Sequence, residues 1–197
     1  MKNTSPKEEG VRERKRRETL QRIAETGLQL FVKHGYDATT LETIAEASGI
    51  SRRTFFYYFK SKEEIVLAWQ RGLAEALRSV VLEQSTKQPP LEAVKNALLK
   101  LTARYHSDKS IMIDKLMRSN EALAARTHAK YVESEQAVFE ALCIMWPEPK
   151  RRKALRAVAM MSIGAMRLAL DAWGAEEGKR PLSAYLRDSF ANLKAEL

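Results

Sequence analysis

The chain has 197 residues, of which 45% are hydrophobic and 30% charged, a balance that predicts a folded protein and excludes a chain disordered throughout. Its 34 Lys and Arg outnumber its 25 Asp and Glu, which favours an acidic partner such as nucleic acid, an anionic membrane surface or a phosphorylated ligand. The single cysteine, Cys143, excludes an intrachain disulfide and any metal site built from several cysteines.

Several classes of protein are excluded by what the sequence lacks. No apolar stretch approaches the length of a transmembrane helix, and residues 1–10 lack the hydrophobic segment of a secretory signal. Only three histidines are present, and no motif for nucleotide phosphates or a catalytic zinc occurs. We therefore expect a cytoplasmic protein with no membrane partner, no catalytic residues, no bound metal and no cofactor.

Helical periodicity runs through almost the whole chain, which predicts an all-α fold. Residues 1–10 form a polar arm that we expect to be disordered. The predicted helices nearest the N-terminus cover residues 12–34, 41–47, 52–59 and 62–84. Beyond the break at Pro89 and Pro90, the predicted helices cover residues 91–105, 111–117, 121–145, 151–173 and 182–193.

The segment from residue 40 to residue 59 has the residue types of a helix-turn-helix. Ile44 and Ala45 give its first helix an inner face, and alanine is small enough for a second helix to cross closely. Gly49 permits the tight turn, and Ser51 is suited to cap the second helix. The spacing therefore predicts a DNA-binding motif, with double-stranded DNA as the partner.

The second helix of such a motif must present polar or basic groups outward at its N-terminal end, where it enters the major groove. Arg52, Arg53 and Thr54 occupy this end, and an arginine can donate two hydrogen bonds to one guanine. These three side chains are our candidates for contacts with base edges.

The aromatic run that follows divides by helical phase. Phe55 and Phe59 lie four residues apart and should face the core. Tyr57 and Tyr58 should lie toward the backbone of the duplex, where a phenol can donate to a phosphate. A run of aromatics that is buried throughout is the alternative.

The residues of this region resemble the TetR family of bacterial repressors over about residues 12–69. The matching stretches are Phe31-Val32-Lys33-His34-Gly35-Tyr36, Thr39-Thr40, Ile44 to Ser51, Thr54 to Phe59, and Lys60-Ser61-Lys62-Glu63. The resemblance implies an N-terminal three-helix DNA-binding domain with a helix-turn-helix, over residues 11–60. It also implies a C-terminal helical domain, over residues 61–197, that binds a small-molecule effector and forms a homodimer.

The same resemblance assigns roles to particular side chains. Thr40 would contact phosphate, and Tyr57, Tyr58 and Lys62 would hold phosphates. The full set of expected DNA-binding residues is Thr40, Ser51, Arg52, Arg53, Thr54, Tyr57, Tyr58 and Lys62. Phe56 departs from the tyrosine that is usual in the family, and it has no hydroxyl for a phosphate.

A basic cluster precedes this region, between Arg12 and Arg17. Cations are poorly placed at a helix N-terminus, because the helix dipole is positive there. The misplacement favours contact with an external anion such as a phosphate, and a solvated helix start is the alternative.

The C-terminal part resembles, more weakly, TetR-type regulators of acyl-CoA-like ligands, in residues 116–123 and 165–173. The candidate orienting groups for a ligand are Tyr105, Asn120, His128 and Tyr131, and Arg118 is a candidate partner for an anionic ligand group. Four methionines could line an adaptable apolar pocket or fill the core: Met145, Met160, Met161 and Met166. The cations at residues 150–153 either meet an anionic ligand group or form a solvated helix start.

Together these patterns predict a DNA-binding transcriptional repressor that leaves a palindromic operator when a small, mostly apolar ligand binds. An activator or a ligand-independent regulator of the same fold is the alternative, and a helical enzyme or an RNA-binding module is a more remote one. We expect the last two helices to pair with those of a second copy in a four-helix contact. Small residues on the first of them allow a close approach (Ala154, Ala157, Ala165, Ala169 and Ala172), and a stripe of Leu182, Leu186, Phe190 and Leu193 lies on the second. Packing of that stripe within one chain is the alternative.

Overall fold

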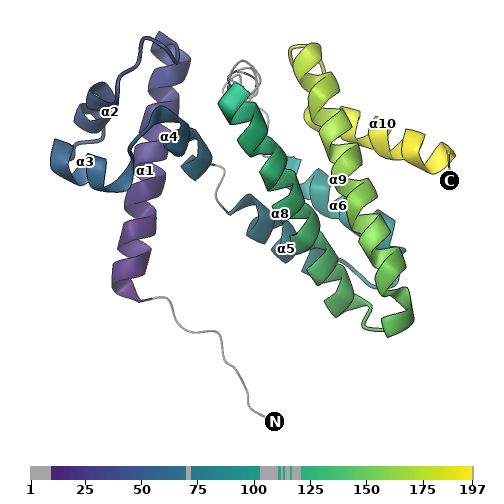
Figure 1. Ribbon diagram of the computed structural model, residues 1–197. Helices are drawn as coiled ribbons and strands as arrows, with labels where there is room; N and C mark the ends of the chain where they lie inside the picture. Colours follow the sequence, from purple (N-terminus) through teal and green to yellow (C-terminus); the bar gives the residue numbers. More distant parts are fainter. Residues whose placement is uncertain are drawn as a thin grey trace. The chain divides into compact units, whose positions relative to one another are not determined.

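The computed structural model describes residues 10–69, 72–102, 111, 113, 116 and 121–196. Within these residues the secondary structure is helical and contains no strand, which confirms the all-α prediction. The chain divides into two compact units, Met1–Arg71 and Gly72–Leu197. The helices of both units are labelled in Figure 1.

The first unit is built on one long helix, α1 (Val11–His34). The shorter helices α2 (Leu41–Ala47), α3 (Arg52–Tyr58) and α4 (Lys62–Trp69) follow it in the chain. Helices α2 and α4 pack on α1, and α3 packs on α2. The buried apolar residues of this unit are Ile23, Ala24, Leu28, Phe31, Ile44, Ala45, Phe55, Phe59, Ile65, Val66 and Ala68.

A glycine in α1 sets how closely these helices approach. A Cβ atom on Gly27 would lie 2.7 Å from Cγ2 of Ile65 in α4 and 3.5 Å from Cγ2 of Ile44 in α2. Because Ile65 and Ile44 are both fully buried, neither side chain can move aside without disturbing the core. The close approach of α1 to α4 and α2 therefore depends on glycine, which has no side chain, at position 27.

The fourth predicted helix, expected to run to Gln84, is wrong in its extent. Helix α4 ends at Trp69, and α5 (Leu73–Leu82) begins after Gly72. Gly72 has φ 88° and ψ −5°, a left-handed conformation that glycine adopts readily and that no helix continues through. Helix α4 packs on α1 in the first unit, whereas the sequence-based boundary at residue 60 assigned it to the C-terminal domain.

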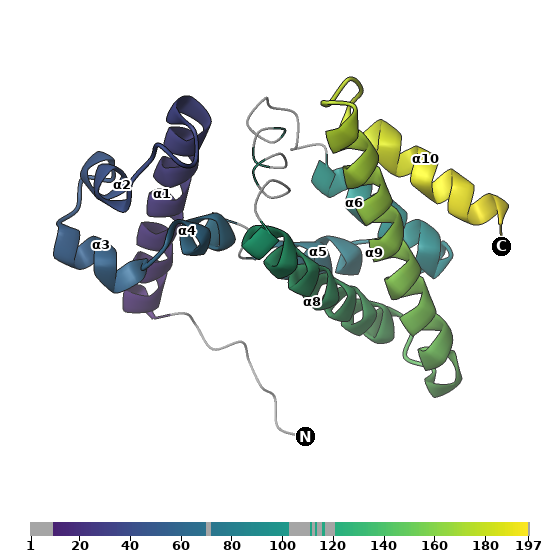
Figure 2. The same cartoon turned by 45° about the horizontal axis from the view of Figure 1, so that its top comes forward.

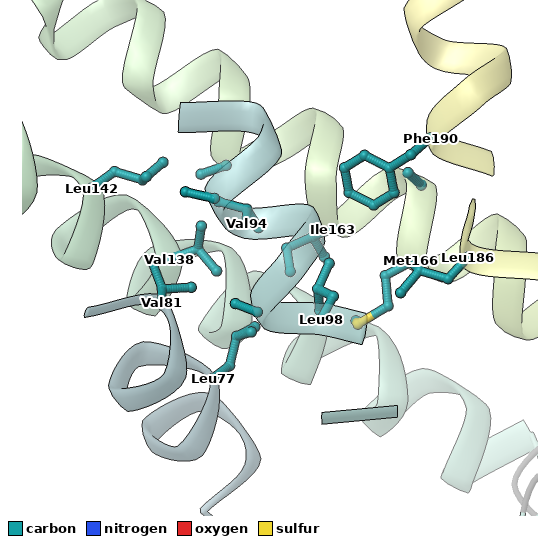
Figure 3. Packing of buried hydrophobic residues seen from close by; sticks show 14 of the residues in the cluster. Leu77, Val81, Val94, Leu98, Val138, Leu142, Ile163, Met166, Leu186 and Phe190 are labelled. Carbon is teal, nitrogen blue, oxygen red and sulfur yellow. The ribbon is translucent and has the colours of Figure 1, made fainter. Parts of the chain in front are cut away.

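The second unit consists of α5, α6 (Pro90–Thr102), α8 (Glu121–Met145), the 3-10 turn η1 (Pro149–Arg151), α9 (Arg152–Ala175) and α10 (Leu182–Ala195). Figure 3 shows that these helices contribute to one apolar cluster. Leu77 of α5, Leu98 of α6 and Val138 of α8 lie in it with Ile163 of α9 and Leu186 of α10. Burial of these side chains supplies the main stabilisation of the unit.

The stripe on α10 packs within its own chain, so its predicted role as the contact with a second copy is wrong, whereas the pairing of the last two helices with their symmetry mates stays a prediction. Leu182, Leu186 and Phe190 are buried in the single chain, and Leu193 is partly buried against the same cluster. Helix α10 lies against α9 and α6, which cover its apolar face. A surface that is already covered in the monomer is not free to bind a second copy.

Two further classes of feature are missing from the part of the chain that the structure describes. No group of three or more His, Cys, Asp or Glu side chains there lies close enough together to hold a metal ion. None of the helices found in those residues combines the length and the apolar character that crossing a bilayer requires.

Candidate nucleic-acid interface

Both helices of the predicted helix-turn-helix begin with a hydroxyl cap. The hydroxyl of Thr40 accepts a hydrogen bond from the backbone N–H of Thr43 at 3.1 Å, and the two threonine hydroxyls lie 2.8 Å apart. Ser51 accepts from the backbone N–H of Thr54 at 3.2 Å, and those two hydroxyls lie 2.9 Å apart. When Thr43 or Thr54 is the donor in its hydroxyl pair, the hydrogen of the capping hydroxyl is free to donate to a DNA phosphate.

The turn between the two helices is formed by its backbone and one buried hydroxyl. Gly49 has a φ of 66°, in the left-handed region that favours glycine. The hydroxyl of Ser48 donates to the carbonyl oxygen of Ile44 at 2.7 Å, which closes the end of α2. The turn therefore places α3 across α2 as the spacing predicted.

Helix α3 is oriented by its two buried phenylalanines. Phe55 and Phe59 are both buried, with ring centroids 6.0 Å apart, which confirms their predicted place in the core. Arg52, Arg53 and Thr54 are exposed at the N-terminal end of the same helix. The first turn of α3 contains no acidic residue, so the two guanidinium groups are not neutralised from within that turn.

The two tyrosines of α3 differ in exposure. Tyr57 is 74% exposed, so a run of aromatics buried throughout is wrong, and Tyr58 is half-buried beside it with ring centroids 5.2 Å apart. Phe56 is also exposed and has no hydroxyl. The phenol of Tyr57 is thus accessible to a phosphate.

Lys62 lies in a cluster of contacts with residues more than 20 positions earlier in the chain. Its ammonium donates to the carbonyl oxygen of Tyr36 at 2.7 Å and to that of Asp37 at 3.5 Å. The same nitrogen lies 4.3 Å from the centroid of the Tyr36 ring, a cation–π contact. The Tyr36 hydroxyl donates to Glu63 at 2.8 Å.

Two pKa values are shifted in this cluster. Partial burial, followed by the hydrogen bond to Glu63 and the nearby carboxylates, raises the pKa of Tyr36 well above its usual value. Burial also opposes ionisation of Glu63, but hydrogen bonds from its own backbone N–H, Ser61 and Tyr36 outweigh it and lower the pKa of that carboxyl. Tyr36 and Glu63 lie within the matched stretches, but nothing in the sequence showed that residues 27 positions apart would meet.

The basic cluster at the start of α1 is exposed. Arg12, Arg14, Lys15, Arg16 and Arg17 all have exposed side chains. Among the side chains of α1 that the structure describes, the first buried apolar one is Ile23, and the N-terminal turns extend away from α2 in both Figure 1 and Figure 2. One ion pair in the cluster joins Arg14 and Glu18 at 3.7 Å. The cluster therefore presents cations to solvent, and both phosphate contact and a solvated helix start remain predictions.

The candidate ligand groups are only partly within the described residues. Tyr105, Arg118 and Asn120 lie outside them, and His128 lies in the part of α8 whose side chains are not described. Tyr131 is half-buried, and the guanidinium carbon of Arg167 lies 4.9 Å from the centroid of its ring. The ligand role of these residues remains a prediction.

The four methionines do not share one environment. Met166 is buried in the apolar cluster, and Met145 is partly buried against it. Met161 is half-buried, whereas Met160 is 53% exposed on α9. They therefore cannot all line a single internal pocket in this conformation.

The cations near residue 150 are held against aromatic rings. Arg151 lies over Trp146 with 5.7 Å from its guanidinium carbon to the ring centroid. Arg152 and Arg156 lie over Phe139, each at 5.1 Å. These contacts give the arginines a packing role at the end of α8, whether or not an anionic ligand group approaches them.

Comparison with known proteins places both units in one family. The model of bacterial regulatory proteins of the tetR family matches residues 23–69, and the model of the MftR C-terminal domain matches residues 88–197. The HTH-type transcriptional regulator TcmR of Streptomyces glaucescens is 36% identical over 111 residues, covering 56% of this chain and 49% of TcmR. The repressor AcnR of Corynebacterium glutamicum is 29% identical over 123 residues, covering 62% of this chain and 61% of AcnR. The chain thus spans about half to three fifths of these curated relatives.

Solved structures share the fold. A TetR-family regulator of Mesorhizobium loti superposes with a TM-score of 0.63 at 18% identity, covering 90% of this chain and 94% of the other. FadR of Thermus thermophilus, a TetR-family repressor solved with lauroyl-CoA, has a TM-score of 0.60 at 24% identity, covering 88% and 92%. The two curated relatives are a transcriptional regulator and a transcriptional repressor. From its helix-turn-helix to its C-terminal helices, the chain belongs to the TetR family of bacterial regulatory proteins.

Proposed function

We propose that this protein is a transcriptional repressor that binds double-stranded operator DNA through α3. The observation that carries the proposal is the exposure of Arg52, Arg53 and Thr54 at the N-terminal end of a helix anchored by buried Phe55 and Phe59. This arrangement suits insertion of that end into the major groove. The proposed contacts outside the bases come from Thr40, Ser51, Tyr57 and Tyr58.

A gel-shift assay with duplex DNA from upstream of the protein's own coding region tests DNA binding. Arg52→Ala or Arg53→Ala should relax the preference at one base position and cost about 1–3 kcal/mol if that guanidinium binds one guanine through two hydrogen bonds. Arg187→Ala, at an exposed position on α10, is the matched control and should leave binding unchanged. Equal affinity for all sequences, or binding that salt does not weaken, would contradict the proposal.

The repressor binds as a homodimer, because α3 has only seven residues and one such helix offers few contacts. Two copies then bind a pseudo-palindrome whose half-sites lie about 34–36 Å apart or a multiple of it. The proposed dimer surface is on α9, where exposed Met160 and Leu168 lie on one face with Gly164 between them. These residues are four apart and so lie on one side of a helix.

A double substitution tests this surface. Met160→Glu with Leu168→Glu should give a monomer with weak operator binding, measured by analytical ultracentrifugation and gel shift. Ile144→Glu on α8 is the control, because Ile144 is 58% exposed and lies outside the proposed surface. A doubly substituted protein that stays dimeric and fully active would place the contact elsewhere.

The proposed effector is a small, mostly apolar molecule such as a fatty acyl thioester. Support comes from the weak sequence resemblance in the C-terminal unit and from the fold shared with FadR, which was solved with lauroyl-CoA. A ligand releases DNA only if it binds the two conformations of the protein unequally. Stabilisation in a thermal-shift screen of acyl-CoAs and fatty acids, followed by release of the operator, tests the proposal. A ligand that stabilises the protein but does not release it from DNA would contradict this proposal. It would favour a regulator that stays on its operator when the ligand binds.

A further inference from the structure

Ser162, in the middle of α9, carries a buried hydroxyl that has no hydrogen-bond partner among the residues that the structure describes. The side chain is 0% exposed, so bulk water does not reach it. On folding, this hydroxyl gives up its hydrogen bonds to water and gains none in return, which destabilises the folded chain. A buried polar group of this kind calls for a reason outside the stability of the fold.

Other buried hydroxyls of this chain have partners in the backbone. Ser48 donates to the carbonyl oxygen of Ile44 at 2.7 Å, and Thr102 donates to that of Leu99 at 3.0 Å. A serine inside a helix can make such a bond to the carbonyl four residues earlier. Ser162 makes none with the described residues, so its donor and its acceptor are both available to a group that does not belong to them.

The face of α9 that carries Ser162 is otherwise apolar. The other buried residues of this helix are all hydrophobic: Leu155, Ala159, Ile163, Ala165, Met166, Ala169 and Trp173. Ala159 and Met166 lie three and four residues from Ser162 and so on the same side of the helix. Figure 3 shows Met166 in the apolar cluster with Leu98 of α6. A methionine has three rotatable bonds, so this face can repack around an apolar ligand.

This combination of one hydroxyl and an adaptable apolar face matches a particular chemistry of ligand. A hydrocarbon chain would bury its surface against the apolar side chains. In a fatty acyl thioester, the carbonyl oxygen is the polar atom nearest to that chain, and it can only accept a hydrogen bond. The hydroxyl of Ser162 can donate to it. The phosphates of a CoA group would lie outside the apolar cluster, because burying an unpaired charge is costly.

We propose that Ser162 donates a hydrogen bond to the carbonyl oxygen of an acyl thioester, and that it thereby selects ligands with an oxygen at the head of the hydrocarbon chain. The inference rests on the proposed effector and assigns the residue that recognises it. Binding of the carbonyl gives the hydroxyl the partner that it lacks in the free protein. A ligand without this oxygen would leave the hydroxyl unpaired, which is the physical basis of the selection.

Two matched ligands test the contact by isothermal titration calorimetry. Lauroyl-CoA has the carbonyl, and S-dodecyl-CoA is the thioether of the same chain length that lacks it. The wild-type protein should bind lauroyl-CoA about three- to tenfold more tightly, the equivalent of one hydrogen bond. Ser162→Ala should lose this preference without weakening the binding of S-dodecyl-CoA. Ser79→Ala, at an exposed serine on α5, is the matched control and should keep the preference.

The outcomes separate this inference from the proposed effector. Equal affinity of the wild-type protein for the two ligands, or a preference that Ser162→Ala keeps, would overturn the inference and leave the acyl thioester as the effector. Equal weakening of both ligands in Ser162→Ala would assign the hydroxyl to the fold or to a buried water, and would also overturn it. A wild-type protein that binds neither ligand would overturn the effector and this inference together.

The free protein gives a second measurement, which needs no ligand. Ser162→Ala should leave the midpoint of thermal unfolding unchanged or raise it, because the substitution removes a hydroxyl without a partner. The rise in midpoint that lauroyl-CoA produces should be smaller in Ser162→Ala than in the wild-type protein. A midpoint that falls in the free variant would mean that the hydroxyl is already paired without a ligand, and would overturn the inference.

Discussion

The helices inside each of the two units of this chain are held together by different kinds of contact. In Met1–Arg71, hydroxyl caps, a lysine–carbonyl contact and a close helix crossing at Gly27 determine where the short helices lie. In Gly72–Leu197, the helices meet in one apolar cluster. In the same unit, the hydroxyl of Ser162 on α9 is buried without a hydrogen-bond partner among the described residues. Directional polar contacts and one close crossing thus add to the apolar interior of the first unit, whereas non-directional packing dominates the second.

The largest effect on stability is expected from a substitution inside the apolar cluster of the second unit. Leu186→Ala removes a side chain that is 0% exposed, and loss of its burial together with the cavity left behind should cost about 2–5 kcal/mol. The control is Ile144 on α8, an isomer of leucine that is 58% exposed. Ile144→Ala should change the free energy of unfolding by no more than about 0.5 kcal/mol. Chemical denaturation measures both, and similar losses for the two variants would contradict the placement of α10.

A pair of glycine substitutions compares the units directly. Gly27→Ala should destabilise the first unit, because overpacking against buried Ile65 costs about 1–3 kcal/mol and exceeds the helix-propensity gain of about 1 kcal/mol. In the Met160→Glu/Leu168→Glu protein, where the proposed dimer surface is not in use, Gly164→Ala should stabilise the second unit by up to about 1 kcal/mol, since nothing in the same chain lies within 4 Å of its added Cβ. The midpoint of thermal unfolding should therefore fall in Gly27→Ala and rise in Gly164→Ala. A stabilising Gly27→Ala would contradict the close crossing.

A pair of serine substitutions sharpens the contrast in polar contacts. Ser51→Ala removes the cap of α3 and should cost about 0.5–2 kcal/mol, with weaker operator binding. Ser162→Ala removes a buried hydroxyl that lacks a partner, and it should be neutral or stabilising by about 1 kcal/mol. Denaturation of each variant beside wild type gives the comparison. A destabilising Ser162→Ala would reveal a polar contact inside the second unit.

The smallest expected effect is a pH dependence of the first unit. Because folding lowers the pKa of Glu63 from its ordinary 4.5, its ionised form stabilises the fold above that pH, and this contribution is lost as the pH falls through the lowered pKa. Glu63→Gln should therefore destabilise the protein near neutral pH and lose its difference from wild type once the pH has fallen below the lowered pKa of Glu63. Unfolding midpoints across that range provide the measurement. A difference that persists at low pH would mean that Glu63 acts through packing and not through charge.

The sequence by itself determined the helix-turn-helix and the family. Thr40 and Ser51 cap helices through a backbone N–H three residues away, and Gly49 turns the chain at one residue, so their partners lie within a few positions. The division of Phe55 and Phe59 from Tyr57 follows from helical phase alone. Such local interactions depend on neighbouring residues, which the sequence shows directly.

The tertiary structure decided which distant segments meet. An apolar stripe on α10 predicts that a face is buried, but hydrophobic burial has no direction, so the sequence did not distinguish α9 and α6 of the same chain from a second copy. Helix formers on both sides of Gly72 favoured one continuous helix, whereas the structure shows the break in the left-handed backbone of Gly72 and in the packing of α4 and α5 in separate units. Lys62 meets Tyr36 because α4 packs on α1, and only that packing brings its charge to a loop 25 residues earlier in the chain.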